Sequence, residues 1–289
     1  MLDDVFQNII NKYINKKTKK IYYLYFSLFK FLTRSNFILQ FKSYKFYASF
    51  NKKSLSRWML KNLKAWDSEN VERIIFFIKK YNGSFVDCGC NFGAYSIPIA
   101  KKFKNQSIYA FDASRRAIYN LEQNISLNKI KNINYFNIGI GDKNTEMYFN
   151  EDISNLKNDG SFRFNKNKKN KKIRIYKLDD VFKNEKVYLN KNIIIKFDLE
   201  GYDFLALKGL TKTLKKSKVI IFIEISKMLL TNSKNFSNEF NLFIKNNSLS
   251  IYDLNLKNKK VDEIIKLLNS INIKNETLGD YIISNHKLL

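Results

Sequence analysis

Histidine and cysteine are almost absent from this sequence, and their scarcity excludes several kinds of active site. The single histidine is His286, close to the C-terminal end, which excludes a Ser-His-Asp triad and a metal centre built from several histidines. The two cysteines, Cys88 and Cys90, are separated by one residue, so they form no disulfide framework and are too few for a zinc site. We therefore expect a reduced, cytoplasmic setting and no metal ion.

Long apolar runs are also missing. No run reaches the ~18 apolar residues of a transmembrane helix. The nearest candidate, "IYYLYFSLFKFL" at residues 21–32, follows the basic "KKTKK" and has no small-residue cleavage site of a signal peptide. Two interpretations of residues 16–32 stay open: a helix that lies on the inner face of an anionic membrane, or a helix that packs on the core or on a second subunit.

Acidic residues are few relative to basic ones. The chain has 52 Lys and Arg against 26 Asp and Glu, a formal charge of +26, which favours nucleic acids, membranes or acidic glycans as partners. The excess is mostly Lys, however, in a sequence that is also rich in Asn, Ile, Tyr and Phe and has one Pro, and no Arg-aromatic platform for stacking bases occurs. We interpret the charge as compositional and do not expect a nucleic acid partner.

Hydrophobic periodicity predicts an N-terminal extension that precedes a larger domain. Residues 2–14 follow one helical face, and "FILQFKSYKFYAS" alternates like a small hairpin. A helical pattern at 71–80 precedes seven strand-like runs with helical segments between most of them, at 85–87, 107–111, 133–138, 193–197, 219–225, 250–254 and 281–284. The polar insert at 150–180 predicts a loop and hairpin with a solvated, lysine-rich tip.

Strands that alternate with helices predict an α/β fold. We expect a mostly parallel, seven-stranded sheet with helices on both faces, and the 45% hydrophobic content suffices for its core. Ligands of such sheets bind at the carboxyl ends of the strands. The residues that follow each predicted strand are therefore the candidates for a functional site.

The first of these strands ends in "SFVDCGCNFGAYS", which contains Asp87, Gly89 and Gly93. A dinucleotide-binding loop has the pattern G-x-G-x-x-G, and an acidic side chain at the strand end would repel a pyrophosphate. The same side chain suits a ligand with an ammonium or sulfonium group, such as S-adenosylmethionine. Asp-Gly pairs at strand ends also occur as simple turns.

Two further acidic residues follow the next two strands. Asp112, in "YAFDAS", is placed to hold the two hydroxyls of a ribose, and the alternative is that it is the N-cap or a first-turn acid of the helix at 115–128. Asp142, in "NIGIGDKN", is placed to meet an adenine edge, and a plain turn explains it equally well. Acids at adjacent strand ends favour the cofactor interpretation.

Several segments in order resemble the FkbM-type S-adenosylmethionine-dependent methyltransferases: "FVDCGCNFGAYS", "YAFDAS", "LEQNISLN", "KLDDVF", "KFDLEGYDFLALKG" and "IIFIEIS". The resemblance runs from about Trp66 to the C-terminus, which implies an extension at residues 1–65 and a methyltransferase domain at residues 66–289. It implies a Rossmann-like class I methyltransferase fold and S-adenosylmethionine as cofactor, bound by Asp87, Gly89, Asn91, Gly93, Asp112 and Asp142. This sequence departs from the family pattern at Asp112, where Glu is usual, at Ala113, where Pro is usual, and at Ser226, where His is frequent.

Three carboxylates are the candidates for catalysis. Asp198 and Glu200 follow the fourth strand of the main sheet, and in an extended segment residues two apart face the same way. Two neighbouring carboxylates tend to raise one pKa, which suits a general base, and we give this role to Asp198. The alternative is that Asp198 binds the cofactor and Glu200 caps the next helix. Glu224 ends the following strand and could contact substrate hydroxyls.

The resemblance implies transfer of a methyl group to a hydroxyl, and we expect a sugar of a polysaccharide or lipid-linked glycan as acceptor. Two other classes compete with this hypothesis. An RNA methyltransferase would explain the positive charge, and a non-catalytic module would use the sheet for binding alone. The sequence does not predict the oligomeric state.

Overall fold

The computed structural model describes residues 37–48, 58–59, 62, 64–150, 163–164, 171–184, 187–232, 235–271 and 277–288. The predicted helix at 2–14, the segment at 16–32 and most of the lysine-rich tip lie outside these residues. The division of the chain at residue 65 stays a prediction. Within the described part of the chain, no helix is both long and apolar enough to cross a membrane.

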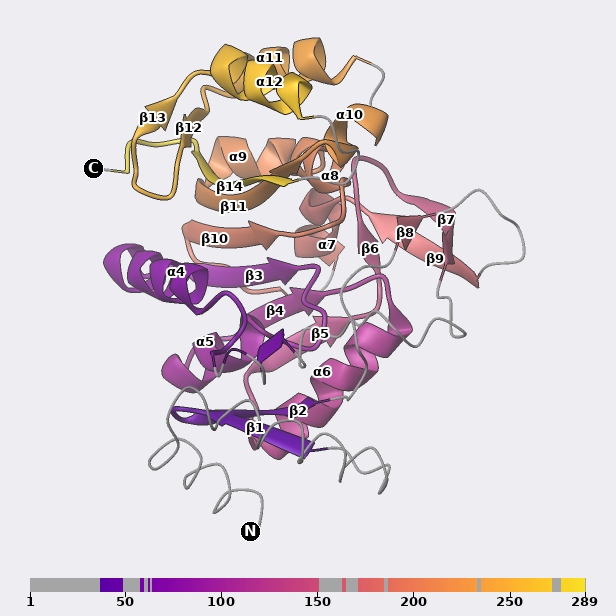
Figure 1. The fold of residues 1–289 in the computed structure, drawn as a ribbon, viewed down its shortest axis with the longest axis vertical. Coiled ribbons are helices and arrows are strands. Elements are labelled where there is room, and N and C mark those ends of the chain that lie inside the picture. The colour runs from indigo at the N-terminus through magenta and orange to yellow at the C-terminus, as the bar shows by residue number, and fades with distance from the viewer. Residues whose placement is uncertain are drawn as a thin grey trace.

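The main sheet has eight strands in the order β13-β12-β14-β11-β10-β3-β4-β5 (Figure 1). The five adjacent strands β11, β10, β3, β4 and β5 run parallel to one another, whereas β14 runs antiparallel to β11 and β12. The strands are β3 (Ser84–Cys88), β4 (Ile108–Phe111), β5 (Ile133–Phe136), β10 (Asn192–Phe197), β11 (Lys218–Ser226), β12 (Ser250–Tyr252), β13 (Asn258–Lys259) and β14 (Thr277–Ser284). All seven predicted strands occur, so the α/β prediction is confirmed. The count is corrected to eight by the two-residue β13, which is too short to give a sequence pattern.

Helices cover both faces of this sheet, as predicted (Figure 1). Alternate residues of the central strands, such as Phe85 and Val86, point to opposite faces and belong to two separate cores. One core packs against α4 (Ser68–Tyr81), α5 (Ser96–Lys102) and α6 (Arg115–Leu127). The other packs against α7 (Leu178–Asn184), α8 (Asp203–Lys208), α9 (Thr211–Lys216), α10 (Met228–Asn232), α11 (Phe236–Asn246) and α12 (Val261–Ser270). Burial on both faces explains why the central strands are nearly continuous apolar runs.

The chain segment between β5 and β10 forms a second, separate sheet. Its strands, in the order β6-β9-β7-β8, are β6 (Gly139–Ile140), β7 (Thr145–Asn150), β8 (Arg163–Phe164) and β9 (Lys171–Tyr176). The polar insert contributes β8 and β9, and each pairs antiparallel with β7, which ends where the insert begins, rather than with the other. The hairpin predicted within residues 150–180 is therefore corrected, because β7 lies between its two strands.

The predicted N-terminal hairpin is also present, as β1 (Phe37–Phe41) and β2 (Tyr44–Ala48). Two asparagines, one in α6 and the other at its C-cap, bind the edge of β2. Asn124 Oδ1 accepts the Tyr47 N–H at 2.8 Å, and Asn128 Oδ1 accepts the Lys45 N–H at 2.8 Å. Asn124 also donates to the Phe92 carbonyl at 2.9 Å, so it joins the hairpin to the loop that follows β3.

Replacing Asn124 by alanine should destabilise the protein by about 2–3 kcal/mol, because two hydrogen bonds are lost and a buried carbonyl is left unpaired. Urea unfolding measures this loss. Gln123→Ala, at the adjacent exposed position of α6, is the matched control and should stay within about 0.5 kcal/mol of wild type. Equal stabilities of the two variants would show that Asn124 does not anchor the hairpin.

Candidate active site

The loop between β3 and α5 is held tightly by its two glycines. Gly89 and Gly93 have φ of +82° and +92°, a region that disfavours other residues. A Cβ on Gly89 would lie 2.0 Å from the Asp198 carbonyl oxygen, and one on Gly93 would lie 2.6 Å from Leu121 Cδ1. The glycines therefore let this loop lie directly against the end of β10 and against α6. The resemblance implies that Gly89 binds the cofactor, whereas the neighbouring chain already requires a glycine at this position.

Asp87 is completely buried at the end of β3. One oxygen accepts the Ser96 hydroxyl at 2.6 Å, and the other lies 3.8 Å from Lys196 Nζ. Burial raises the pKa of this carboxyl, against the lowering effects of Lys196 and Ser96. Since its side chain is covered, Asp87 influences a ligand in this conformation through its charge and its hold on Lys196 rather than by contact.

Asp112 lies at the end of β4, beside this loop. Its Oδ2 accepts the Asn91 N–H at 2.9 Å and its Oδ1 accepts the Ser114 N–H at 2.8 Å. Burial raises the pKa of Asp112 to about 6, although both backbone donors lower it. The N-cap of α6 is Ser114, whose hydroxyl accepts the Ala117 N–H, so the alternative role of Asp112 as that cap is wrong. Each carboxylate oxygen keeps a second lone pair for a ligand.

Asp142 lies apart from these residues. Its nearest cation is Lys208 of α8, at 3.8 Å, and Lys208 also pairs with Glu239 of α11 at 3.1 Å. The predicted contact of Asp142 with an adenine edge stays a prediction.

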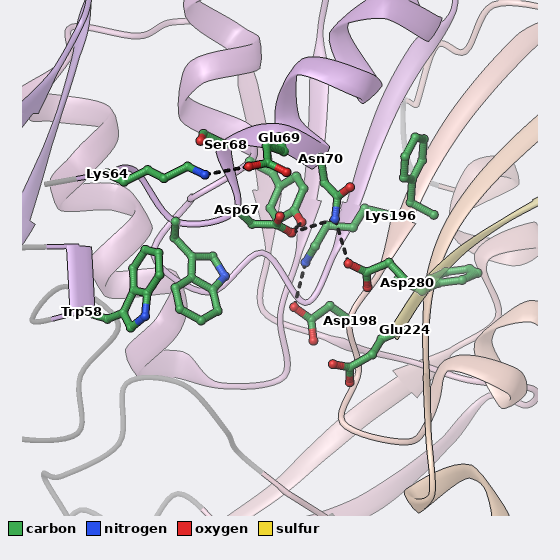
Figure 2. Close-up of a pocket in the computed structure, with 14 residues that line it drawn as sticks. Trp58, Lys64, Asp67, Ser68, Glu69, Asn70, Lys196, Asp198, Glu224 and Asp280 are labelled. Atoms are coloured by element: carbon green, nitrogen blue, oxygen red, sulfur yellow. Dashed lines mark hydrogen bonds and ion pairs between the residues drawn. The ribbon is translucent and has the colours of Figure 1, made fainter. Parts of the chain in front are cut away.

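A cavity of about 370 Å³ opens at the carboxyl ends of β10 and β11, next to the start of α4 (Figure 2). Its lining is rich in carboxylates and aromatic rings: Trp58, Lys64, Trp66, Asp67, Ser68, Glu69, Asn70, Tyr95, Lys196, Phe197, Asp198, Phe222, Glu224 and Asp280. The structure thus brings together two of the three predicted catalytic residues, Asp198 and Glu224.

The expectation that Glu200 faces the same way as Asp198 is wrong, because the chain after β10 is not extended. Glu200 and Gly201 have φ of +50° and +89°. Asp203 fixes this turn by accepting the N–H groups of Leu199 and Gly201, both at 3.1 Å. Glu200 does not line the cavity, although its charge contributes to raising the pKa of Glu224.

Lys196 lines the cavity, although the sequence analysis did not include it among the candidate residues. It lies on β10 and is only 5% exposed. Its ammonium donates to Asp198 Oδ2 at 3.1 Å and to the Gly89 carbonyl at 3.4 Å, and it lies 4.5 Å from the centre of the Tyr95 ring (Figure 2). Burial lowers the pKa of Lys196, but Asp198 and Asp87 outweigh burial and raise it above its ordinary value. The available signal was a lysine inside the apolar run "NIIIKF".

A second polar group links α4 to β14. The amide of Asn70 donates to Asp67 Oδ2 at 3.0 Å and to Asp280 Oδ2 at 2.7 Å, and the Tyr95 hydroxyl also donates to Asp67. Glu224 stands opposite Asp280 in the antiparallel register of β11 and β14. Burial is the main cause that raises the pKa of Glu224 to about 8 and that of Asp280 to about 6. The sequence did not indicate Asp67, Asn70 or Asp280.

The cavity is therefore acidic within a basic chain. Asp67, Asp198, Glu224 and Asp280 face it with Lys196 as the buried cation, while Lys64 is paired with Glu69 at 2.7 Å. Such a site attracts a cationic group. Among the residues that the structure describes, no three His, Cys, Asp or Glu side chains are grouped so that they could hold a metal ion.

Aromatic rings form the other part of the lining. Trp58 and Trp66 contact each other edge to face, with ring centres 5.0 Å apart, and Trp58 is 40% exposed. Trp58 therefore offers part of its ring at the edge of the cavity.

Comparison with known proteins gives a family and several more distant likenesses. The family described as Methyltransferase FkbM domain matches residues 87–269. A tRNA(Phe) (4-demethylwyosine(37)-C(7)) aminocarboxypropyltransferase of Methanocaldococcus jannaschii is 34% identical over 70 residues, which are 24% of this chain and 28% of that protein.

Two solved structures are also similar. A methyltransferase FkbM of Methylobacillus flagellatus KT is 14% identical, with 70% of this chain and 43% of that chain covered and a TM-score of 0.39. TYW2 of M. jannaschii in complex with AdoMet is 15% identical, with 86% and 84% covered and a TM-score of 0.40. This chain thus spans less than half of that FkbM structure and under a third of the curated relative.

The raised pKa of Glu224 predicts a pH-dependent loss of stability. The unfolded carboxyl ionises near pH 4.5 and the folded one near pH 8, so wild type loses up to about 1.4 kcal/mol per pH unit between these values. Glu224→Gln removes this loss. The free energy of unfolding of the variant, relative to that of wild type, should therefore increase by on the order of 2–4 kcal/mol as the pH is raised from 5 to 9. Urea unfolding at several pH values tests this. Glu72→Gln, on an exposed part of α4, is the control, and its free energy of unfolding should differ from that of wild type by the same amount at every pH. If the difference for Glu224→Gln were also independent of pH, the raised pKa would be refuted.

Proposed function

Because the chain belongs to the FkbM family of S-adenosylmethionine-dependent methyltransferases, we propose that it transfers a methyl group to a hydroxyl of a sugar in a polysaccharide or lipid-linked glycan. The observation that supports this most is the acidic, aromatic-lined cavity beside the loop that follows β3. It combines a place for a cationic donor with carboxylates that can accept the proton of a hydroxyl.

The residues present fit S-adenosylmethionine. When bound, this cofactor supplies a methyl group on a positively charged sulfur. The acidic cavity favours that charge, and the free lone pairs of Asp112 suit the hydroxyls of a ribose. The Asn91 N–H and Gly89, which Asp112 and Lys196 hold in place, would shape the loop around the cofactor.

The chain's own carboxylates position the acceptor and take its proton. Asp198 has one oxygen on Lys196 and its second oxygen available to orient a hydroxyl. We now choose Glu224, rather than Asp198, as the general base, because its pKa is near 8 and a base is most effective when its pKa is near the working pH. Placing the acceptor oxygen in line with the methyl group supplies most of the remaining rate enhancement.

The sugar is our choice of acceptor because of the cavity's mixed lining. Trp58 offers a partly exposed ring on which the apolar face of a sugar can stack, and Ser68, Asn70 and Asp280 offer hydrogen-bonding groups. The acidity of the same cavity disfavours an anionic phosphate close to the reacting hydroxyl.

An RNA methyltransferase is the second candidate. The formal charge of +26 and the similarity of one segment to a tRNA-modifying enzyme of M. jannaschii favour it. RNA binding would fall steeply with salt, whereas binding of a neutral glycan would not.

Asp112→Ala should weaken S-adenosylmethionine binding by roughly 10–100-fold, the usual effect of losing hydrogen bonds to a charged group. Calorimetric titration of the cofactor into folded wild type and variant measures this. Asp262→Ala, at an exposed position of α12, is the control and should bind as wild type does. If Asp112→Ala binds equally well, Asp112 does not hold the cofactor.

Methyl transfer from radiolabelled S-adenosylmethionine to a panel of glycans and bulk tRNA would identify the acceptor class. We expect label in a glycan, and Trp58→Ala should raise KM for that glycan about fivefold while the cofactor affinity stays unchanged, because stacking of this kind contributes on the order of 1 kcal/mol. Label in tRNA alone would overturn the sugar acceptor in favour of the second candidate.

A further inference from the structure

We propose that Lys196 sets the electrostatic potential at the transferring methyl group, so that the site favours loss of the positive charge from sulfur. This inference rests on the proposed function. It deepens that function by assigning a role to Lys196, which the sequence analysis did not include among the catalytic residues.

The position of Lys196 carries the inference. Its ammonium lies 3.4 Å from the Gly89 carbonyl, in the proposed cofactor loop, and 3.1 Å from Asp198 Oδ2, in the proposed acceptor cavity. Gly89 belongs to the loop proposed to bind the methyl donor, and Asp198 belongs to the cavity proposed to bind the acceptor. The ammonium therefore lies between the two, where the methyl group would be transferred. It lines the cavity itself.

Burial makes this charge effective. The side chain of Lys196 is 7% exposed, and the Tyr95 ring covers the ammonium at 4.5 Å from the ring centre. Water and salt screen a buried charge much less than a surface charge. The many surface lysines of this chain therefore affect the reacting atoms less than this single one.

The chemistry gives the direction of the effect. As the sulfur–methyl bond breaks, its electron pair goes to sulfur; the acceptor oxygen forms the new bond to the methyl carbon, and its proton goes to a carboxylate. Sulfur changes from cationic to neutral, so a fixed positive charge nearby destabilises the reactant more than the transition state. A difference of that kind accelerates the reaction.

A purely structural role is the competing explanation. Asp87 is fully buried, and its Oδ1 has no hydrogen-bond partner among the described residues, so Lys196 could serve only to neutralise it. In Lys196→Met, Asp87 could then take up a proton, which would hide the change of charge. Asp87→Asn removes that complication because an amide does not titrate.

The electrostatic potential at sulfur can be measured by comparing two forms of the cofactor, and this comparison does not require the acceptor to be known. S-adenosylmethionine carries the sulfonium charge, and its demethylated product, S-adenosylhomocysteine, does not. The affinity ratio of the two, measured by calorimetric titration, is therefore the readout, for wild type, Lys196→Arg, Lys196→Met, Asp87→Asn and the double variant with Asp87→Asn and Lys196→Met.

We expect loss of Lys196 to shift the ratio toward the sulfonium form on the order of tenfold, the size expected of one partly buried charge. The double variant should show this shift relative to Asp87→Asn, even if Lys196→Met alone does not fold. Lys196→Arg should keep the ratio within about threefold. Unchanged ratios in folded variants that still bind both forms would overturn the inference but leave the proposed function standing. A wild-type protein that binds neither form would overturn both.

Discussion

The buried ion cluster around Lys196 is the interaction on which the rest of the site depends. An ammonium inside a sheet is stable only if carboxylates and carbonyls replace the water it has lost. Asp87 on β3 and Asp198 after β10 provide the charges, and the Gly89 carbonyl provides a further acceptor. Because these partners come from two adjacent parallel strands, the cluster fixes how the loops beyond both strands lie.

The same constraint explains the glycine at position 89. The two loops can share one lysine only if they approach closely, and a side chain at Gly89 would collide with the Asp198 carbonyl. The turn at Glu200 and Gly201, fixed by Asp203, then leads the chain back into α8 immediately after Asp198. Asp198 is thereby left at the cavity while the next residues turn away from it.

Sequence patterns predicted the strands and the residues at the ends of neighbouring strands. They did not predict which segments far apart in the sequence meet at the cavity. The strands followed from apolar runs, and the pairing of β3 with β4 places Asp112 beside the loop after Asp87, as the Asn91 contact shows. Period-two reasoning failed at Glu200, because it applies only while the backbone stays extended.

The residues that were missed share a different cause. Asp280 reaches the cavity only because β14 inserts antiparallel between β11 and β12. Asp67 precedes α4 with a left-handed backbone, and Asn70 joins it to Asp280 across 210 positions of sequence. No local pattern encodes such meetings. Lys196 was the exception, because a lysine inside a strand that is buried on both faces always needs a partner.

The acidic cavity also links donor binding to the base. Asp280, with a pKa near 6, and Glu224, with a pKa near 8, lose their protons in turn as the pH rises through neutrality. Each loss makes the cavity more negative, which strengthens its attraction for a sulfonium, and the second also creates the proposed base. Lys196 weakens the attraction for a sulfonium but leaves Glu224 able to ionise, since the charge of Lys196 stays fixed throughout this pH range. With carboxylates alone, the site would stabilise the sulfonium most strongly in the reactant, before its charge is lost. In our proposal, the buried ammonium of Lys196 offsets this stabilisation and so favours transfer.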